Sequence, residues 1–345
     1  MYLFQSDYNM ICHPAVLQHL NDSASLAMIG YGKDDACTRA VQLIRKQCGR
    51  DDLAVHFLSG GTQTNLTVIA AALRPYQAVL APVSAHINEH ETGAIEGTGH
   101  KVITLPANLG KITAQQIDDA AALHYQSVGP DPEHMPQPKM VYISMSTELG
   151  TVYTLAELEA IASVCKRWNL YLYVDGARLG YALASRDSDV TLADLTRLCD
   201  VFYIGGTKQG TMFGEAVVIP NPALAEDFRY MIKHHGGMLA KGWLMGLQFE
   251  ALFTDNLYFK AASDANRKAD KIRTALQNAG IETPFLSGTN QVFAVMTDAA
   301  LEKLAENFLF TEWERVDENH RMIRFCTSWA TTDEQVDALC DFLAQ

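Results

Sequence analysis

The chain has 345 residues, of which 48% are hydrophobic and 19% are charged, so it can bury a sizeable core and is neither disordered nor fibrous. Its net charge is −13 and no lysine and arginine cluster stands out, which argues against nucleic acid or an anionic membrane as a partner. No apolar run approaches the roughly 20 residues of a membrane-spanning helix, and residues 1–10 lack the pattern of a signal peptide, so we expect a soluble protein.

Short runs of β-forming residues alternate with helical patterns between Val55 and Pro220. Thr154 and Glu157 form a capping box, which predicts the start of one helix. Strands separated by helices of this length indicate βαβ crossovers and a mostly parallel sheet covered on both faces. The helix after the first strand carries on one face Leu66, Ile69, Ala70 and Leu73. The expected strands are Val55–Leu58, Ala78–Leu80, Val102–Leu105, Met140–Ser144, Leu170–Val174, Val201–Ile204 and Ala216–Ile219.

The pattern changes near Gly236–Gly246, where a long helical segment begins. Two further strands, Val292–Met296 and Met322–Cys326, alternate with helices after it. At roughly 150 residues per domain the length also suggests about two domains. We therefore expect an α/β protein with an N-terminal segment that contributes to the active site, a large domain and a smaller C-terminal α/β domain, with bounds 1–15, 16–245 and 246–345.

Seven cysteines, an odd number without a CxxC pair, argue against a zinc ribbon or a disulfide framework, and we expect no metal site. Reduced thiols indicate a cytoplasmic protein. Cys165 and Cys340 fall on the apolar stripes of expected helices, where cysteine usually fills space in the core.

Three strand ends carry unusual residues, and ligands of parallel α/β sheets bind at the carboxyl ends of strands. Ser59–Asn65 is a glycine-rich turn before a helix, which suits a phosphate although it matches neither the dinucleotide nor the P-loop fingerprint. Asp175 ends an apolar strand, where an acid needs a cationic partner unless it caps a helix. Lys208, between glycines at another strand end, is either a surface lysine or a buried nucleophile with a depressed pKa.

Pyridoxal 5′-phosphate (PLP) explains these three features together. The glycine-rich turn would hold the phosphate, Lys208 would form the Schiff base, and Asp175 would keep the pyridine nitrogen protonated. The order of turn, aspartate and lysine resembles that of the fold-type-I, aspartate-aminotransferase-like PLP enzymes.

Within that group the chain resembles the L-threonine aldolases and the related β-eliminating lyases over nearly its whole length. The resemblance rests on Ser6-Asp7, Tyr31-Gly32-Lys33-Asp34, SGGTQTN from Ser59, Ala85-His86 with Glu91-Thr92-Gly93, VDGARL from Val174, GGTKQG from Gly205, and Ile323-Arg324-Phe325 with Thr327-Ser328.

The resemblance implies roles for individual residues. Lys208 corresponds to the Schiff-base lysine, Asp175 to the partner of the pyridine nitrogen, and His86 to a histidine that stacks on the cofactor ring. Tyr31 corresponds to a tyrosine that reaches a neighbouring subunit's site, so we expect a homo-oligomer, dimer or tetramer. Phosphate ligands are expected in Gly61, Thr62 and Thr207, and the substrate carboxylate clamp in Ser6, Arg178 and Arg324.

Two departures from the resembled family stand out. Glu148 occupies the place of a histidine that lies near the substrate hydroxyl in many threonine aldolases. Leu239 replaces an arginine that reaches the phosphate across the dimer, a task that Lys241 could take over. We expect Glu148 to take part in deprotonating the β-hydroxyl, directly or through a water. The alternative is that Glu148 accepts hydrogen bonds from backbone N–H groups of the following loop, and His86 or a bound water is then the competing base.

The sequence thus predicts a PLP-dependent lyase that cleaves β-hydroxy-α-amino acids to glycine and an aldehyde. β-Elimination and transamination use the same site parts and stay open. A nicotinamide-dependent oxidoreductase would need a glycine-rich fingerprint that is absent. A non-catalytic protein on the same fold would not need Lys208 together with Asp175 and the arginines.

Overall fold

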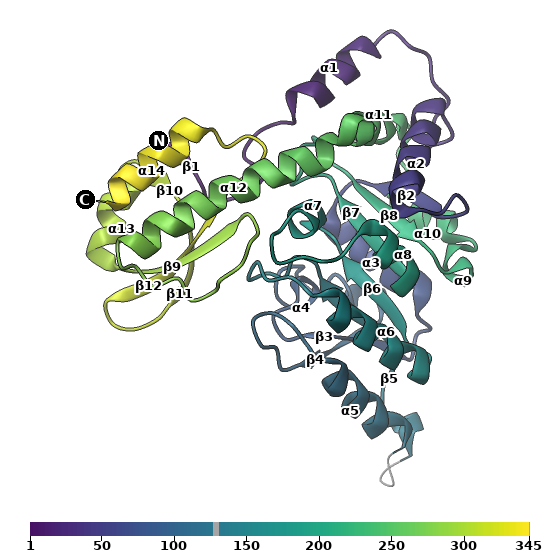
Figure 1. The fold of residues 1–345 in the computed structure, drawn as a ribbon. Coiled ribbons are helices and arrows are strands. Elements are labelled where there is room, and N and C mark those ends of the chain that lie inside the picture. The colour runs from purple at the N-terminus through teal and green to yellow at the C-terminus, as the bar shows by residue number, and fades with distance from the viewer. Residues whose placement is uncertain (127–130, 345) are drawn as a thin grey trace.

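A computed structural model describes residues 1–126 and 131–344, and its largest element is a seven-stranded sheet (Figure 1). The strands of this sheet are β2 (Ala54–Leu58), β3 (Gln77–Pro82), β4 (Lys101–Leu105), β5 (Gln137–Ser144), β6 (Tyr171–Asp175), β7 (Val201–Gly205) and β8 (Glu215–Ile219). Their order is β2-β8-β7-β6-β5-β3-β4; β8 pairs antiparallel with both neighbours, and the strands from β7 to β4 run parallel. The expected fold class, with its mostly parallel sheet, is confirmed, because each expected strand is present.

Helices cover both faces of this sheet, as the alternating pattern predicts. The helices are α1 (Pro14–Asp22), α2 (Asp35–Cys48), α3 (Gly61–Ala72), α4 (His86–Glu89), α5 (Ala114–Tyr125), α6 (Leu155–Trp168), α7 (Leu179–Leu183), α8 (Leu192–Leu198), α9 (Pro222–Ala225), α10 (Phe228–His234), α11 (Trp243–Phe253), α12 (Leu257–Asn278), α13 (Asp298–Ala305) and α14 (Asp333–Leu343), with short 3₁₀ turns at Glu96–Thr98, Pro132–His134 and Thr254–Asn256. One face packs against α2, α5, α6, α8 and α11, and the other packs against α3 and α10.

Two of these helices, α6 and α3, can be compared with their local sequence patterns. Thr154 accepts a hydrogen bond from the backbone N–H of Glu157 and completes the expected capping box of α6. The apolar face expected for α3 is only partly correct, because Leu66 and Ala70 are half-buried. The helix instead turns the buried polar Asn65 inward, where its side chain has hydrogen-bond partners.

A smaller antiparallel sheet lies beside the large one (Figure 1). Its strands are β9 (Gln291–Thr297), β11 (Thr311–Arg315) and β12 (His320–Cys326), and the N-terminal β1 (Tyr2–Leu3) pairs with β10 (Phe308–Leu309) nearby. Helices α12, α13 and α14 share its core. Both chain termini therefore lie in this part of the molecule. The division of the chain at 245/246 falls inside α11 and remains our proposal.

All seven cysteines are free thiols, and Cys340 alone among them is not fully buried. None of the helices in the described part of the chain combines the length and apolar character that crossing a bilayer requires.

Candidate active site

The carboxyl ends of β5, β6 and β7 open into a pocket of about 870 Å³ that also borders β11 and β12. Gly176 permits the close approach of the chain after β6 to β7, because a Cβ there would lie 1.7 Å from the carbonyl oxygen of Tyr203. Most of the residues predicted for the site line this pocket: Gly61, Thr62, His86, Glu148, Asp175, Arg178, Thr207, Lys208 and Arg324.

One end of the pocket is formed by the start of α3. Gly60 is extended and no side chain caps the helix, so the first-turn N–H groups at Gly61 and Thr62 remain open toward the pocket. The N-terminus of a helix with free N–H groups and its dipole attracts anions such as phosphate. The helix begins earlier than the Ser59–Asn65 turn suggested, because Gly60 already ends the extended backbone.

Asp175, at the end of β6, is held by hydrogen bonds to both carboxylate oxygens. The hydroxyls of Tyr142 and Tyr203 each donate to it at 2.6 Å, to Oδ2 and Oδ1 respectively. Asn65 donates to Oδ2 at 3.1 Å, and the backbone N–H of Ala177 donates to Oδ1 at 2.9 Å. Four donors satisfy the lone pairs of this buried carboxylate and so offset the cost of taking it out of bulk water. These four hydrogen bonds fix the orientation of the Asp175 carboxylate at the floor of the pocket.

Lys208 follows β7 in a turn, and its half-buried side chain lines the pocket. Burial lowers the pKa of its amine and Arg178 lowers it further, although the carboxylates of Asp7, Asp175 and Glu215 act in the opposite direction. A lowered pKa increases the fraction of neutral amine, the form that attacks a carbonyl. Glu215 accepts a hydrogen bond from the N–H of Gly206 at 2.8 Å, and burial raises its pKa to about 7.

His86 is fixed by a second buried carboxylate. Its Nδ1 lies 2.7 Å from Oε1 of Glu91, whose side chain is fully buried. The same oxygen accepts a hydrogen bond from Asn65 at 2.7 Å, and Asn65 also contacts Asp175. A single network thus orients the imidazole and the aspartate, as outer partners commonly do for functional side chains.

The two arginines of the expected carboxylate clamp differ in which of their N–H donors lack a partner. Arg178 donates from Nε and Nη2 to the two oxygens of Asp7, at 2.7 and 3.0 Å. Arg324 donates from Nη1 to Gln291 at 3.0 Å, and its buried Nε has no hydrogen-bond partner within the described residues. Its guanidinium lies 4.9 Å from the centre of the Trp313 ring. Arg324 therefore presents the better two-donor edge for a carboxylate.

Glu148 lies in the turn after β5. Its Oε1 accepts hydrogen bonds from the hydroxyl of Ser144 at 2.7 Å and from the N–H of His86 at 3.2 Å. Its Oε2 is buried and has no hydrogen-bond partner within residues 1–126 and 131–344. Burial raises the pKa of Glu148, although the hydrogen bond from Ser144 opposes this shift. The backbone N–H that Glu148 accepts from belongs to His86 and not to the loop after Glu148, and the role of Glu148 as a base stays a prediction.

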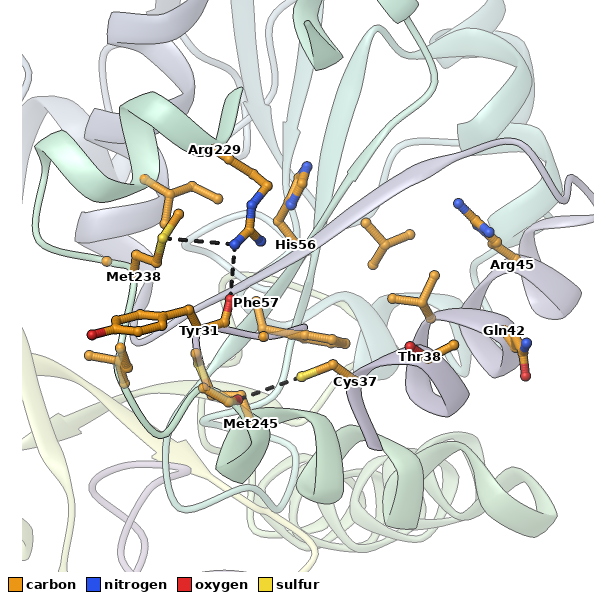
Figure 2. A pocket seen from close by; sticks show the side chains of 17 residues that line it. Tyr31, Cys37, Thr38, Gln42, Arg45, His56, Phe57, Arg229, Met238 and Met245 are labelled. Atoms are coloured by element: carbon orange, nitrogen blue, oxygen red, sulfur yellow. Dashed lines mark hydrogen bonds between the residues drawn. The ribbon is translucent and has the colours of Figure 1, made fainter. Parts of the chain in front are cut away.

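Three predicted site residues lie elsewhere in the single chain. Ser6 is buried, and its hydroxyl donates to Asn9 at 2.6 Å. Lys241 is exposed and lines neither pocket. Tyr31 borders a second pocket of about 270 Å³, shown in Figure 2, where its carbonyl accepts a hydrogen bond from Arg229 at 3.0 Å.

Sequence reasoning missed the partners of the predicted residues. Tyr142, Tyr173 and Tyr203 each stand two residues before the end of neighbouring strands, a recurrence that the sequence does contain. Glu91 was noted only as part of a resemblance, and no local signal indicates that it supports His86.

The pocket fits the predicted cofactor. The open start of α3 suits a phosphate, Asp175 suits a protonated ring nitrogen, and Lys208 suits a Schiff base. The unpartnered buried atoms on Glu148 and Arg324 are those that a bound amino acid could satisfy.

The chain is similar to proteins of known family over most of its length. Residues 15–299 match the family described as beta-eliminating lyase. The chain is 33% identical to a low specificity L-threonine aldolase of Pseudomonas aeruginosa, over 90% of the chain and 87% of that protein. It is 34% identical to the protein of the same description from another Pseudomonas species, over 87% of the chain and 86% of that protein.

Solved structures agree with this. The structure of a Leishmania major threonine aldolase superposes with a TM-score of 0.96 and 43% identity, covering 99% of this chain and 98% of that one. An aspartate aminotransferase from Thermus thermophilus, at 13% identity and a TM-score of 0.71 over 100% and 91% of the two chains, shares the fold. The fold-type-I architecture expected from the sequence is thereby confirmed.

Proposed function

Because the chain belongs to the β-eliminating lyase family and is a PLP-dependent lyase, we propose that it cleaves β-hydroxy-α-amino acids of the L-threonine or L-allo-threonine type to glycine and an aldehyde. The observation that carries this proposal is the position of Glu148. Glu148 lines the same pocket as Lys208, Asp175 and Arg324, and its buried Oε2 has no hydrogen-bond partner among the described residues. Cleavage of a β-hydroxy-α-amino acid requires a base close to the groups that bind the amine and the carboxylate of the substrate.

The pocket residues divide the chemistry among them. Arg324 binds the substrate carboxylate through its free edge and so fixes which bond at the α-carbon can break. Lys208, whose pKa is lowered mainly by burial, would hold the cofactor as a Schiff base, and Asp175 would pair with the ring nitrogen of the cofactor. When bound, PLP acts as a sink for the electron pair released at the α-carbon. His86, held by Glu91, flanks the same space.

Glu148 accepts the proton of the β-hydroxyl in this proposal. The hydrogen bonds from Ser144 and His86 fix Oε1, which leaves Oε2 as the basic atom. Burial raises the pKa of Glu148 toward neutral pH, and a general base is most effective when its pKa lies near the pH at which the enzyme works. Glu148→Gln keeps the shape and removes the base, so turnover should fall by about 10²- to 10⁴-fold.

This variant should keep its visible chromophore and its affinity for glycine, which has no β-hydroxyl. A matched control is Glu96→Gln, since Glu96 is exposed and lies outside the pocket. If Glu148→Gln cleaves β-hydroxy amino acids at the rate of the wild type, the base is another group, with His86 or a water next in line.

Two measurements test the activity itself. A visible absorption band that borohydride bleaches establishes the cofactor bound to a lysine. Incubation with L-threonine then separates the reactions, because an aldolase yields glycine and acetaldehyde in equal amounts, whereas β-elimination yields a keto acid and ammonia. Formation of a keto acid without glycine would overturn the aldolase proposal in favour of the β-eliminating alternative.

We further propose a homo-oligomer, in which Tyr31 and Lys241 serve the site of another subunit. Tyr31 is half-exposed with a left-handed backbone (φ 64°), and it borders the second pocket beside Met238 (Figure 2). Leu26 and Ile29 on the preceding segment expose 56% and 69% of their surface, which favours burial against a second copy. A monomeric mass in sedimentation together with full activity would contradict this. The free thiols support a cytoplasmic location.

A further inference from the structure

Gln291 is the first residue of β9, and its side chain is fully buried. Phe293, two residues later, lies opposite Arg324 in the antiparallel pairing of β9 with β12. Side chains two apart on a strand share a face, so Gln291 reaches Arg324 diagonally. Its Oε1 accepts the 3.0 Å hydrogen bond from Nη1 of Arg324.

The other end of the same amide holds the turn that carries Glu148. Nε2 of Gln291 donates to the carbonyl oxygen of Thr147 at 3.2 Å. Thr147 directly precedes Glu148, and its own N–H donates to Thr151 across the turn at 2.9 Å. One planar group with a donor and an acceptor thus joins the arginine to the turn.

The contact also decides which edge of Arg324 stays free. The guanidinium lies over the ring of Trp313, and its Nη1 is taken by Gln291. Its Nε is buried, and no hydrogen-bond acceptor among the described residues reaches it. The edge with Nε and Nη2 therefore remains for a carboxylate, which binds such an edge through two parallel hydrogen bonds.

Thr289 provides a comparison within the same loop. Its hydroxyl donates to the carbonyl oxygen of Gly150 at 2.8 Å, so it holds the Glu148 turn as well. No hydrogen bond joins Thr289 to Arg324 in the part of the chain that the structure describes.

We propose that Gln291 is a positioning residue that holds Arg324, the receptor of the substrate carboxylate, and Glu148, the base for the β-hydroxyl, in one fixed register. The proposal rests on the proposed function of these two residues. A substrate whose carboxylate sits on Arg324 then presents its hydroxyl to Glu148, and loosening the amide affects binding and proton transfer together.

Gln291→Met tests this in the holoenzyme, because methionine conserves volume and removes both hydrogen bonds. Glycine affinity, measured from the visible spectrum, reports on Arg324 alone, since glycine has no β-hydroxyl. The glycine Kd should rise by about 10- to 100-fold, the usual effect of losing a hydrogen bond to a charged group. The kcat for L-threonine should fall by about 10-fold or more.

Thr289→Val is the matched control. It removes a hydrogen bond to the same turn, so kcat should fall while the glycine Kd stays that of the wild type. A general loss of structure would change both kcat and the glycine Kd in both variants. An unchanged glycine Kd in Thr289→Val therefore excludes that explanation.

A double-mutant cycle isolates the coupling to Glu148. In a Glu148→Gln background, Gln291→Met should change kcat no further, whereas its effect on the glycine Kd should persist. If the effect on kcat is the same in both backgrounds, or if the glycine Kd of Gln291→Met is unchanged, the inference is overturned.

Gln291→Glu serves if the methionine variant does not fold. It keeps an acceptor for Arg324 but cannot donate to Thr147, so kcat should fall, and a kcat equal to that of the wild type overturns the inference. A wild-type enzyme that does not cleave β-hydroxy amino acids would overturn the proposed function instead, which keeps the two failures distinguishable.

Discussion

Asp7→Asn perturbs an ion pair that is buried beside Lys208. The Asp7 side chain is fully buried and the Arg178 side chain is 12% exposed. Asp7 accepts hydrogen bonds from Nε and Nη2 of Arg178 and, at 2.9 Å, from Asn290. Asparagine keeps the shape of the side chain but leaves the guanidinium without its counter-charge.

The magnitude follows from the pKa of Asp7. Burial acts to raise this pKa, but the charges of Arg178 and Lys208 and the hydrogen bonds to Asp7 outweigh burial and lower it from 3.8 to about 2. This difference corresponds to about 2.4 kcal/mol of stability at 1.36 kcal/mol per pH unit. Removing one partner of a buried pair typically costs about 3–5 kcal/mol. We therefore expect Asp7→Asn to lose about 2–5 kcal/mol at pH 7.

The stability that Asp7 contributes depends on pH. Because the pKa of Asp7 is lower in the folded state, its contribution is fully present above pH 3.8 and is lost as the pH falls through about 2. The difference between wild type and variant should therefore narrow below pH 3.8.

Urea unfolding of the holoenzyme, followed by circular dichroism from pH 7 down to pH 3, measures this difference. Asp52→Asn is the control, since its pair with Arg50 is exposed and should contribute less than about 1 kcal/mol. A loss in Asp7→Asn no larger than in the control, or one independent of pH over this range, would refute the reasoning.

Three further predictions concern the frame of the site. Gly176→Ala should destabilise the protein by about 3 kcal/mol or more, because its Cβ would meet a backbone oxygen at 1.7 Å, whereas Gly97→Ala, with no atom within 4 Å, should change the urea midpoint little. Tyr142→Phe removes a donor from the buried aspartate at the end of β6 and should cost about 1.5–3 kcal/mol in the same assay, against almost nothing for Tyr230→Phe at an exposed position. Burial raises the pKa of Glu215 from 4.5 to about 7, so its contribution to stability is present below pH 4.5 and lost as the pH rises through about 7; Glu215→Gln should flatten this decline, and an unchanged pH profile would contradict it.

The sequence by itself predicted the strands of the large sheet and the residues that gather in the candidate site. Alternating apolar runs and helical patterns gave every strand of the large sheet, because these signals depend on neighbours a few residues apart. Asp175 and Lys208 could be recognised because each follows a buried strand, and parallel strands end at one edge. The glycine-rich segment before α3 could be recognised as a candidate phosphate site, although the helix begins at Gly61, inside the segment expected as a turn.

Tertiary structure alone decided how these residues are held. Asp7 and Arg178 are 171 positions apart in the chain, and no periodicity links residues at such a distance. The same holds for Gln291, which reaches Arg324 because β9 pairs with β12 and reaches Thr147 because this antiparallel sheet lies against the large one. Local patterns fix secondary structure, whereas the partners of a buried charge depend on which strands pack together, and that is set by the whole core.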